Sequence, residues 1–218
     1  MEPGYREKLI MHAFYPKRVP FFNPTTLKIV LFYGALFELV EKGLLHIEDN
    51  RIICSATETG DEVLDKVIGF IAPHSGKKLS HLQMVVPQKA GAVYKVQTEQ
   101  MVKRNYLTGE PVTFLFWRVG TRYHARRYDM LLPGIKSMES ILVYGRKPDR
   151  RSWLMIMIVA EAGLFRNIFP IREFRKKAGR RFRELLKTDF HTSDPAIPGL
   201  LQSLRRTLSS QKANRGPV

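Results

Sequence analysis

Two nearly continuous apolar stretches dominate the pattern of hydrophobic and polar positions along the chain. One runs from Trp153 to Ala160 without a polar side chain, and the other runs from Leu27 to Val40 with few interruptions. An apolar run that shows no polar face is typical of a helix buried on all sides. We therefore predict two central helices, at about 25–41 and 152–164, that lie beside each other in the core. The second is shorter than the roughly 20 residues needed to cross a bilayer, and we expect no membrane span.

The remaining pattern predicts shorter helices and two small β-hairpins. Leu44–Ile47 and Arg51–Cys54 are β-type runs separated by turn residues, and 112–119 and 121–127 form a similar pair about Gly120. Helical spacing of apolar residues predicts further helices over 6–14, after a cap at Thr59 or Asp61, and over 90–106, 133–145 and 171–190. The fold class predicted is mainly α, a helical bundle around the two apolar helices with two small β-hairpins.

Prolines and composition divide the chain into three parts. Pro16, Pro20 and Pro24 prevent a continuous helix near the start, so 1–24 is expected to form an N-terminal arm. Residues 25–190 form the helical domain, in keeping with a length of 218 residues. The polar and basic composition of 191–218 predicts a flexible basic tail, with at most a short helix at 199–208.

The charge balance restricts the class of partner. Lys and Arg number 36 against 20 Asp and Glu, which gives a formal net charge of +16. Such an excess predicts attraction to an anionic partner: nucleic acid, a lipid headgroup layer or an acidic protein. A single cysteine, Cys54, allows no internal disulfide, and the first residues lack the pattern of a signal peptide. We expect a cytoplasmic protein whose contact with membranes is peripheral.

Candidate catalytic and metal-binding patterns are weak. The chain has no Gly-x-Ser-x-Gly sequence, and Gly76-Lys77 lacks the spacing of a phosphate-binding loop. The six histidines include no pair spaced i,i+4, and no second cysteine can join them as a metal ligand. We therefore expect no enzymatic activity, no metal and no cofactor.

The second hairpin combines aromatic and basic residues in a way that suits a membrane interface. Its candidate contacts are Phe114, Phe116, Trp117, Arg118 and Arg122. Rings insert at the level of the headgroups while arginines stay beside the phosphates. Peripheral binding to anionic lipid is therefore the leading hypothesis. The alternative is that one apolar face of the hairpin packs on its own chain or on a second copy in a homo-oligomer.

A second candidate surface is the basic segment 172–187. The cations proposed to form it are Arg175, Lys176, Arg180 and Arg183, and the alternative is that these charges are merely solvated. Arginine and lysine interleaved with aromatics also suit single-stranded nucleic acid, which stays open as the competing class of partner.

Three stretches together resemble the Golgi phosphoprotein 3 family. They are Glu38-Leu-Val-Glu-Lys-Gly-Leu-Leu45, then Thr59-Gly-Asp61 with Leu64 and Asp65, and finally Asp149-Arg-Arg151 followed by the apolar run that ends in Ala-Gly-Leu-Phe165. The resemblance covers roughly 27–190. It implies a helical bundle with a prominent hydrophobic hairpin, binding to phosphatidylinositol 4-phosphate on the cytosolic face of Golgi membranes in eukaryotic members, and an adaptor role toward protein clients.

The family's lipid pocket is implied to use one tryptophan and three arginines, which this chain does not keep. The aligned positions hold Asn23, Phe32, Gln97 and Gln100. Within a helical turn of them lie the candidate headgroup cations Lys28, Lys95, Lys103 and Arg104. The divergence suggests a prokaryotic relative.

Overall fold

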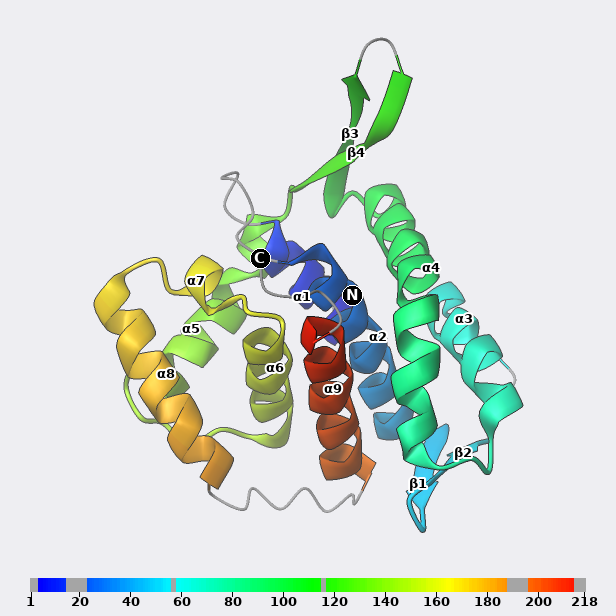
Figure 1. The fold of residues 1–218 in the computed structure, drawn as a ribbon. Helices are drawn as coiled ribbons and strands as arrows, with labels where there is room; N and C mark the ends of the chain where they lie inside the picture. The colour runs from blue at the N-terminus through cyan, green and yellow to red at the C-terminus, as the bar shows by residue number, and fades with distance from the viewer. Residues whose placement is uncertain (1–3, 15–22, 56–57, 115–116, 188–195, 214–218) are drawn as a thin grey trace. The chain divides into compact units, whose positions relative to one another are not determined.

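The computed structural model describes residues 4–14, 23–55, 58–114, 117–187 and 196–213. As the sequence predicts, the fold is mainly α with two small antiparallel hairpins (Figure 1). Contacts divide the chain into two compact units, one built from 1–22 and 97–189 and the other from 23–96 and 190–218. Each unit is described by itself below. Among the described residues, no helix combines the length and the apolar character needed to cross a membrane.

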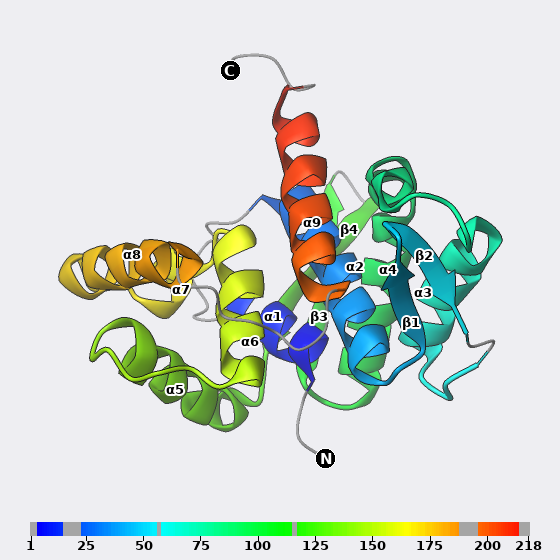
Figure 2. The same ribbon diagram turned by 90° about the horizontal axis from the view of Figure 1, so that it is seen from below.

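The unit formed by 23–96 and 190–218 is built around helix α2 (Pro24–Glu41). The Asn23 side chain caps α2 by accepting hydrogen bonds from the backbone N–H groups of Thr25 and Thr26. Helix α2 contacts α3 (Glu62–Ile71) and α9 (Ala196–Ala213), and α9 runs beside it in both ribbon views (Figures 1 and 2). From Ile29 to Phe37 the helix is buried without interruption, which confirms the expected core helix.

The first hairpin belongs to the same unit. Strands β1 (Leu45–Glu48) and β2 (Arg51–Cys54) pair with Glu48 opposite Arg51. The turn residues Asp49 and Asn50 have φ angles of 47° and 60°. This left-handed conformation is tolerated by Asp and Asn and is the geometry of a type I′ turn. Turn chemistry therefore defines this hairpin locally, as expected from the sequence.

The Thr59-Gly-Asp motif closes the N-terminus of α3. The Asp61 carboxylate accepts hydrogen bonds from the N–H groups of Val63 and Leu64 at 2.9 and 3.1 Å. The Thr59 N–H and hydroxyl both donate to Asp65, at 2.6 and 2.7 Å. The motif is therefore a helix cap of the kind expected from polar residues before an apolar run.

The unit formed by 1–22 and 97–189 holds the second apolar helix, α6 (Arg150–Glu161). Asp149 caps it by accepting from the Ser152 N–H at 2.7 Å, and Gly163 follows its end with a φ of +73°. Helix α6 contacts α1 (Tyr5–Ala13) and α5 (Leu132–Leu142). Short helix α7 (Phe165–Ile168) and α8 (Arg172–Lys187) follow, and α8 contacts both α5 and α7 (Figure 2).

The two apolar helices, α2 and α6, belong to different compact units, so their expected packing side by side stays a prediction. One expectation about where a helix begins was wrong. Helix α4 (Leu82–Lys103) begins at Leu82 rather than near Ala90, because Pro87 is accommodated early in the helix instead of breaking it.

The segment predicted to form a flexible basic tail contains helix α9, which is longer than the short helix expected at 199–208. Its residues Ile197, Leu200, Leu204 and Thr207 are fully buried. These positions recur at helical spacing, so an apolar stripe lies within a segment whose composition is polar overall. The overall composition of 191–218 therefore did not reveal the apolar stripe of α9.

Candidate functional site

The second hairpin is the element that the sequence singles out for a membrane contact. Strands β3 (Leu107–Phe114) and β4 (Trp117–Ala125) pair antiparallel, with Phe114 opposite Trp117 and an irregularity in register between Val112 and Thr113. The expected turn at Gly120 was wrong: Gly120 lies inside β4, opposite Val112. Glycine indicates a turn only where a left-handed conformation is needed, and the bulge absorbs Gly120 within the strand instead.

The structure places Phe114, Trp117 and Arg118 at the outer end of the hairpin. Trp117 begins β4 and is 78% exposed, which leaves a large aromatic ring in solvent. Phe114 ends β3 and Arg118 follows Trp117 in β4, while Phe116 lies outside the described residues. Arg122 is exposed and is paired in register with Glu110. The hairpin thus carries an exposed aromatic residue at its end and a cation along its length.

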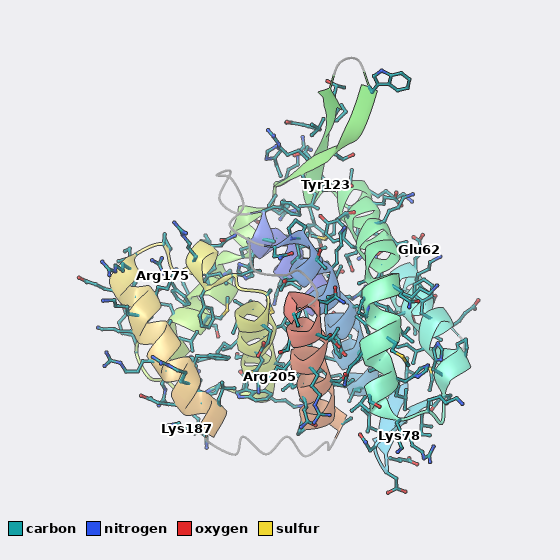
Figure 3. The ribbon with its side chains drawn as sticks, in the orientation of Figure 1. Glu62, Lys78, Tyr123, Arg175, Lys187 and Arg205 are labelled. Carbon is teal, nitrogen blue, oxygen red and sulfur yellow. The ribbon has the colours of Figure 1, made fainter. Side chains whose placement is uncertain are left out.

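The inner end of the hairpin is held by its own unit. The ring of Tyr123 contacts that of Phe14, which follows α1, at 5.9 Å between centroids (Figure 3). A side chain at Gly109 would crowd this ring, because its Cβ would lie 3.3 Å from Cε1 of Tyr123. The Arg126 guanidinium donates to the Asn105 side chain, and Arg127 forms an ion pair with Asp129 at 3.0 Å. These contacts fix the base and leave the outer end free of them.

Helix α8 presents the second predicted surface. Its apolar stripe faces inward: Ala178 and Leu185 are buried, and the ring of Phe182 meets that of Phe165 edge to face at 5.5 Å. Lys176, Arg180 and Arg183 are exposed. Arg175 differs from them, because its guanidinium donates to the backbone oxygens of Phe169 and Pro170 and so ties the start of the helix to the preceding loop. Figure 3 labels Arg175 and Lys187 near the two ends of α8.

The four candidate headgroup cations do not share one compact unit. Lys28 and Lys95 belong to the unit of α2, and Lys103 and Arg104 belong to the unit of α1. The Lys28 ammonium lies over the ring of Tyr94, 5.6 Å from its centroid. Arg104 forms an ion pair with the buried Glu7 carboxylate at 3.7 Å. The other two, Lys95 and Lys103, are exposed.

Sequence reasoning missed a set of buried polar residues in α1, within the segment expected to be an arm. Arg6 is 2% exposed and donates to the Gln97 side chain at 2.8 Å, and Glu7 is 5% exposed. Gln97 and Phe32, two positions aligned with the family's lipid pocket, are fully buried. These two side chains therefore belong to the interior of their units. The alternation of charged and apolar residues in α1 offers no signal that its polar face is covered.

The described residues contain no group of three or more His, Cys, Asp or Glu side chains that could hold a metal ion. Histidines of the second hairpin and the 74–81 region make other contacts. His124 approaches Glu110 at 3.4 Å, and the rings of His74 and His81 lie 4.6 Å apart between centroids with their planes tilted by 51°.

Comparison with known proteins places the chain in a family. A search of curated proteins finds no match. The family model described as Golgi phosphoprotein 3 (GPP34) matches residues 8–207, from α1 to the middle of α9. Because this match spans nearly all the described helices and includes the three motifs that suggested the resemblance, the chain belongs to the Golgi phosphoprotein 3 family.

Proposed function

We infer that the chain is a non-enzymatic, peripheral membrane-binding protein that recognises anionic lipid headgroups. The observation that carries this proposal is the exposure of Trp117 at the outer end of the β3–β4 hairpin. Covering an aromatic ring that is 78% exposed to water lowers the free energy of the system, because apolar surface is removed from water. Tryptophan is enriched at the boundary between lipid headgroups and acyl chains for the same reason.

The distribution of charge supports an anionic surface as the covering partner. Arg122 is exposed on the hairpin, and Lys176, Arg180 and Arg183 are exposed on α8 of the same unit. Each lysine or arginine near an anionic leaflet contributes about 1 kcal/mol of attraction. Insertion of Trp117 and attraction of these cations would therefore act together, as in other two-signal membrane contacts.

The proposed lipid preference is for anionic headgroups in general, with phosphatidylinositol 4-phosphate as the family's example. Selectivity for that lipid through the family's pocket would require a tryptophan and three arginines, whereas this chain has Asn23, Phe32, Gln97 and Gln100. Buried Phe32 and Gln97 offer no charge to a headgroup. Lys95 and Lys103 are the candidates for a weaker substitute. Family membership supports an adaptor role at the cytoplasmic face of a membrane, which completes the proposal.

Vesicle flotation tests the proposal. We expect the protein to float with vesicles that contain about one third phosphatidylserine and to stay behind with pure phosphatidylcholine. Trp117→Ala should lower the partition coefficient onto these vesicles by at least about tenfold, because it removes an apolar contact of about 1.5–3 kcal/mol. The matched control is Tyr144→Ala, which removes an aromatic residue of similar exposure, 71%, outside the hairpin. Equal loss in both variants, or no binding by the wild type, would rule out the hairpin as the membrane contact.

Three further measurements distinguish lipid selectivity, nucleic-acid binding and homo-oligomer formation. Adding phosphatidylinositol 4-phosphate in place of phosphatidylserine at equal charge measures lipid selectivity. A salt-sensitive gel shift with single-stranded DNA, in the absence of vesicle binding, would assign the cationic surface to nucleic acid. Sedimentation of the Trp117→Ala variant as a smaller species than the wild type would assign the hairpin to a homo-oligomer.

A further inference from the structure

A pocket of about 220 Å³ lies within the unit of α1, α5 and α6. Its apolar lining includes Tyr5, Met138 and Met155. At roughly 30 Å³ for each water molecule, the volume accommodates about seven waters or a small organic molecule of about ten non-hydrogen atoms. None of the positions aligned with the family's lipid pocket lines it. The pocket is too small for acyl chains, so its occupant must be compact.

His12 lines the pocket and is only 1% exposed. Neither of its ring nitrogens has a hydrogen-bond partner within the part of the chain that the structure describes. Buried polar atoms are satisfied in the great majority of cases, and each one left without a partner is costly. A ligand in the pocket would supply the missing partners.

The protonation state of His12 determines which ligand group can form a hydrogen bond with its ring. Burial, helped by the positive charge of Lys8, lowers the pKa of His12 to about 3. The ring is therefore neutral at pH 7, with one nitrogen donating and the other accepting a hydrogen bond. A hydroxyl group, which both donates and accepts, can pair with whichever nitrogen faces it.

Cationic groups line the same pocket. Lys8 and Arg151 contribute side chains, and the Arg151 guanidinium lies over the Tyr5 ring, 5.9 Å from its centroid. Pro133 and Gly134, in the first turn of α5, also line it, and no side chain caps that helix by a hydrogen bond. The Asp149 carboxylate is the one acidic group in the lining, and it already accepts from the Ser152 N–H as the cap of α6. The balance of charge and of helix dipole favours an anion.

We propose that this pocket binds a small phosphate monoester, with the phosphate near Lys8, Arg151 and the first turn of α5 and a hydroxyl of the ligand at His12. The space beside Gly134 supports this placement, because a Cβ at that residue would meet no atom within 4 Å. The phosphate monoester can be a soluble metabolite or the headgroup of a lipid whose chains stay outside. The proposal is independent of the membrane contact at Trp117.

Titration calorimetry with glycerol 3-phosphate and with inorganic phosphate, without vesicles, tests the soluble source. Flotation with vesicles that contain lysophosphatidic acid, whose glycerol keeps one free hydroxyl, tests the lipid source. We expect glycerol 3-phosphate to bind at least tenfold more tightly than inorganic phosphate, because only the ester carries an alcohol hydroxyl, apart from its phosphate, that can reach His12. Lysophosphatidic-acid binding that depends on His12 in the absence of soluble binding would identify a lipid headgroup, and either source supports the site.

Two variants and one control make the assignment specific. His12→Phe should weaken binding by about tenfold while the melting temperature stays the same or rises, because the change removes two unsatisfied buried nitrogens. A histidine with a purely structural role would lower the melting temperature and leave ligand binding in the folded fraction unchanged. Arg151→Gln should also weaken binding by about tenfold, whereas Arg172→Gln, an exposed arginine of the same unit, should not. Absence of binding to every probe, or wild-type binding by Arg151→Gln, would overturn the proposal.

Discussion

The hydroxyl of Tyr33 is a polar atom in the middle of the most apolar helix, and its contacts explain how α9 is positioned on α2. It lies 2.7 Å from Ser203 Oγ and 3.0 Å from Thr207 Oγ1, and the Thr207 hydroxyl also donates to the Ser203 backbone oxygen at 2.9 Å. All three side chains are buried. Buried hydrogen bonds of this kind define one arrangement of two helices whose apolar contacts alone would permit several.

Tyr33→Phe should lower the free energy of unfolding by about 1–2 kcal/mol, because it leaves buried hydroxyls of α9 with one partner fewer. Burial raises the pKa of Tyr33 above its ordinary value of 10.0, against the opposing effect of the Ser203 and Thr207 hydrogen bonds. Ionisation therefore favours the unfolded chain above about pH 10, and wild-type stability should fall faster there than that of Tyr33→Phe. Urea denaturation at pH 7 and pH 10.5 measures both effects. Tyr144→Phe, whose residue is 71% exposed, should change neither.

At the scale of elements, local signals predicted the helices and turns whose causes are local. Asp61, one of the two residues expected to cap α3, does so, and Asp49 and Asn50 form the first hairpin turn. The second hairpin was predicted as an element, but its turn was misplaced because a bulge beside Gly120 shifts the register. Similarly, a helix was predicted from about residue 90, whereas α4 begins at Leu82 and contains Pro87. Bulges and tolerated prolines depend on neighbours that a single sequence does not reveal.

Helix α9 shows the same limit, and its role can be tested. Leu204→Ala should destabilise the protein by about 2–5 kcal/mol, because Leu204 is fully buried and its truncation leaves a cavity. The control on the exposed face of the same helix is Gln202→Ala, which should change stability by less than about 0.5 kcal/mol. Chemical denaturation followed by circular dichroism compares the two. Equal stability of both variants would show that 196–213 is the detachable tail that its composition suggests.

At the scale of the whole molecule, the net charge of +16 predicts an anionic partner but does not locate the contact. The candidate site illustrates the difference. Trp117 and the cations of α8 were identified from the sequence, because aromatic residues beside arginines and runs of basic residues can be recognised there. The pocket around His12 was not, because Lys8, Arg151 and Gly134 come from three separate segments that only the fold brings together. Total charge sets the long-range attraction, and the position of individual charges determines which face docks.

Two triple variants with the same loss of charge separate these contributions. The first variant removes three exposed cations from α8 by changing Lys176, Arg180 and Arg183 to Ala. The second removes three exposed cations from the other unit by changing Lys42, Lys77 and Lys78 to Ala. If α8 faces the membrane, the first variant should bind phosphatidylserine vesicles about 100-fold more weakly, at about 1 kcal/mol for each cation, and should show a shallower dependence on salt. The second should lose less than about threefold, because its three cations lie outside α8, the proposed docking face, and interactions between exposed charges are screened within about 10 Å at 0.1 M salt. Equal losses in the two variants would mean that membrane attraction depends on net charge alone and that α8 is not the docking face.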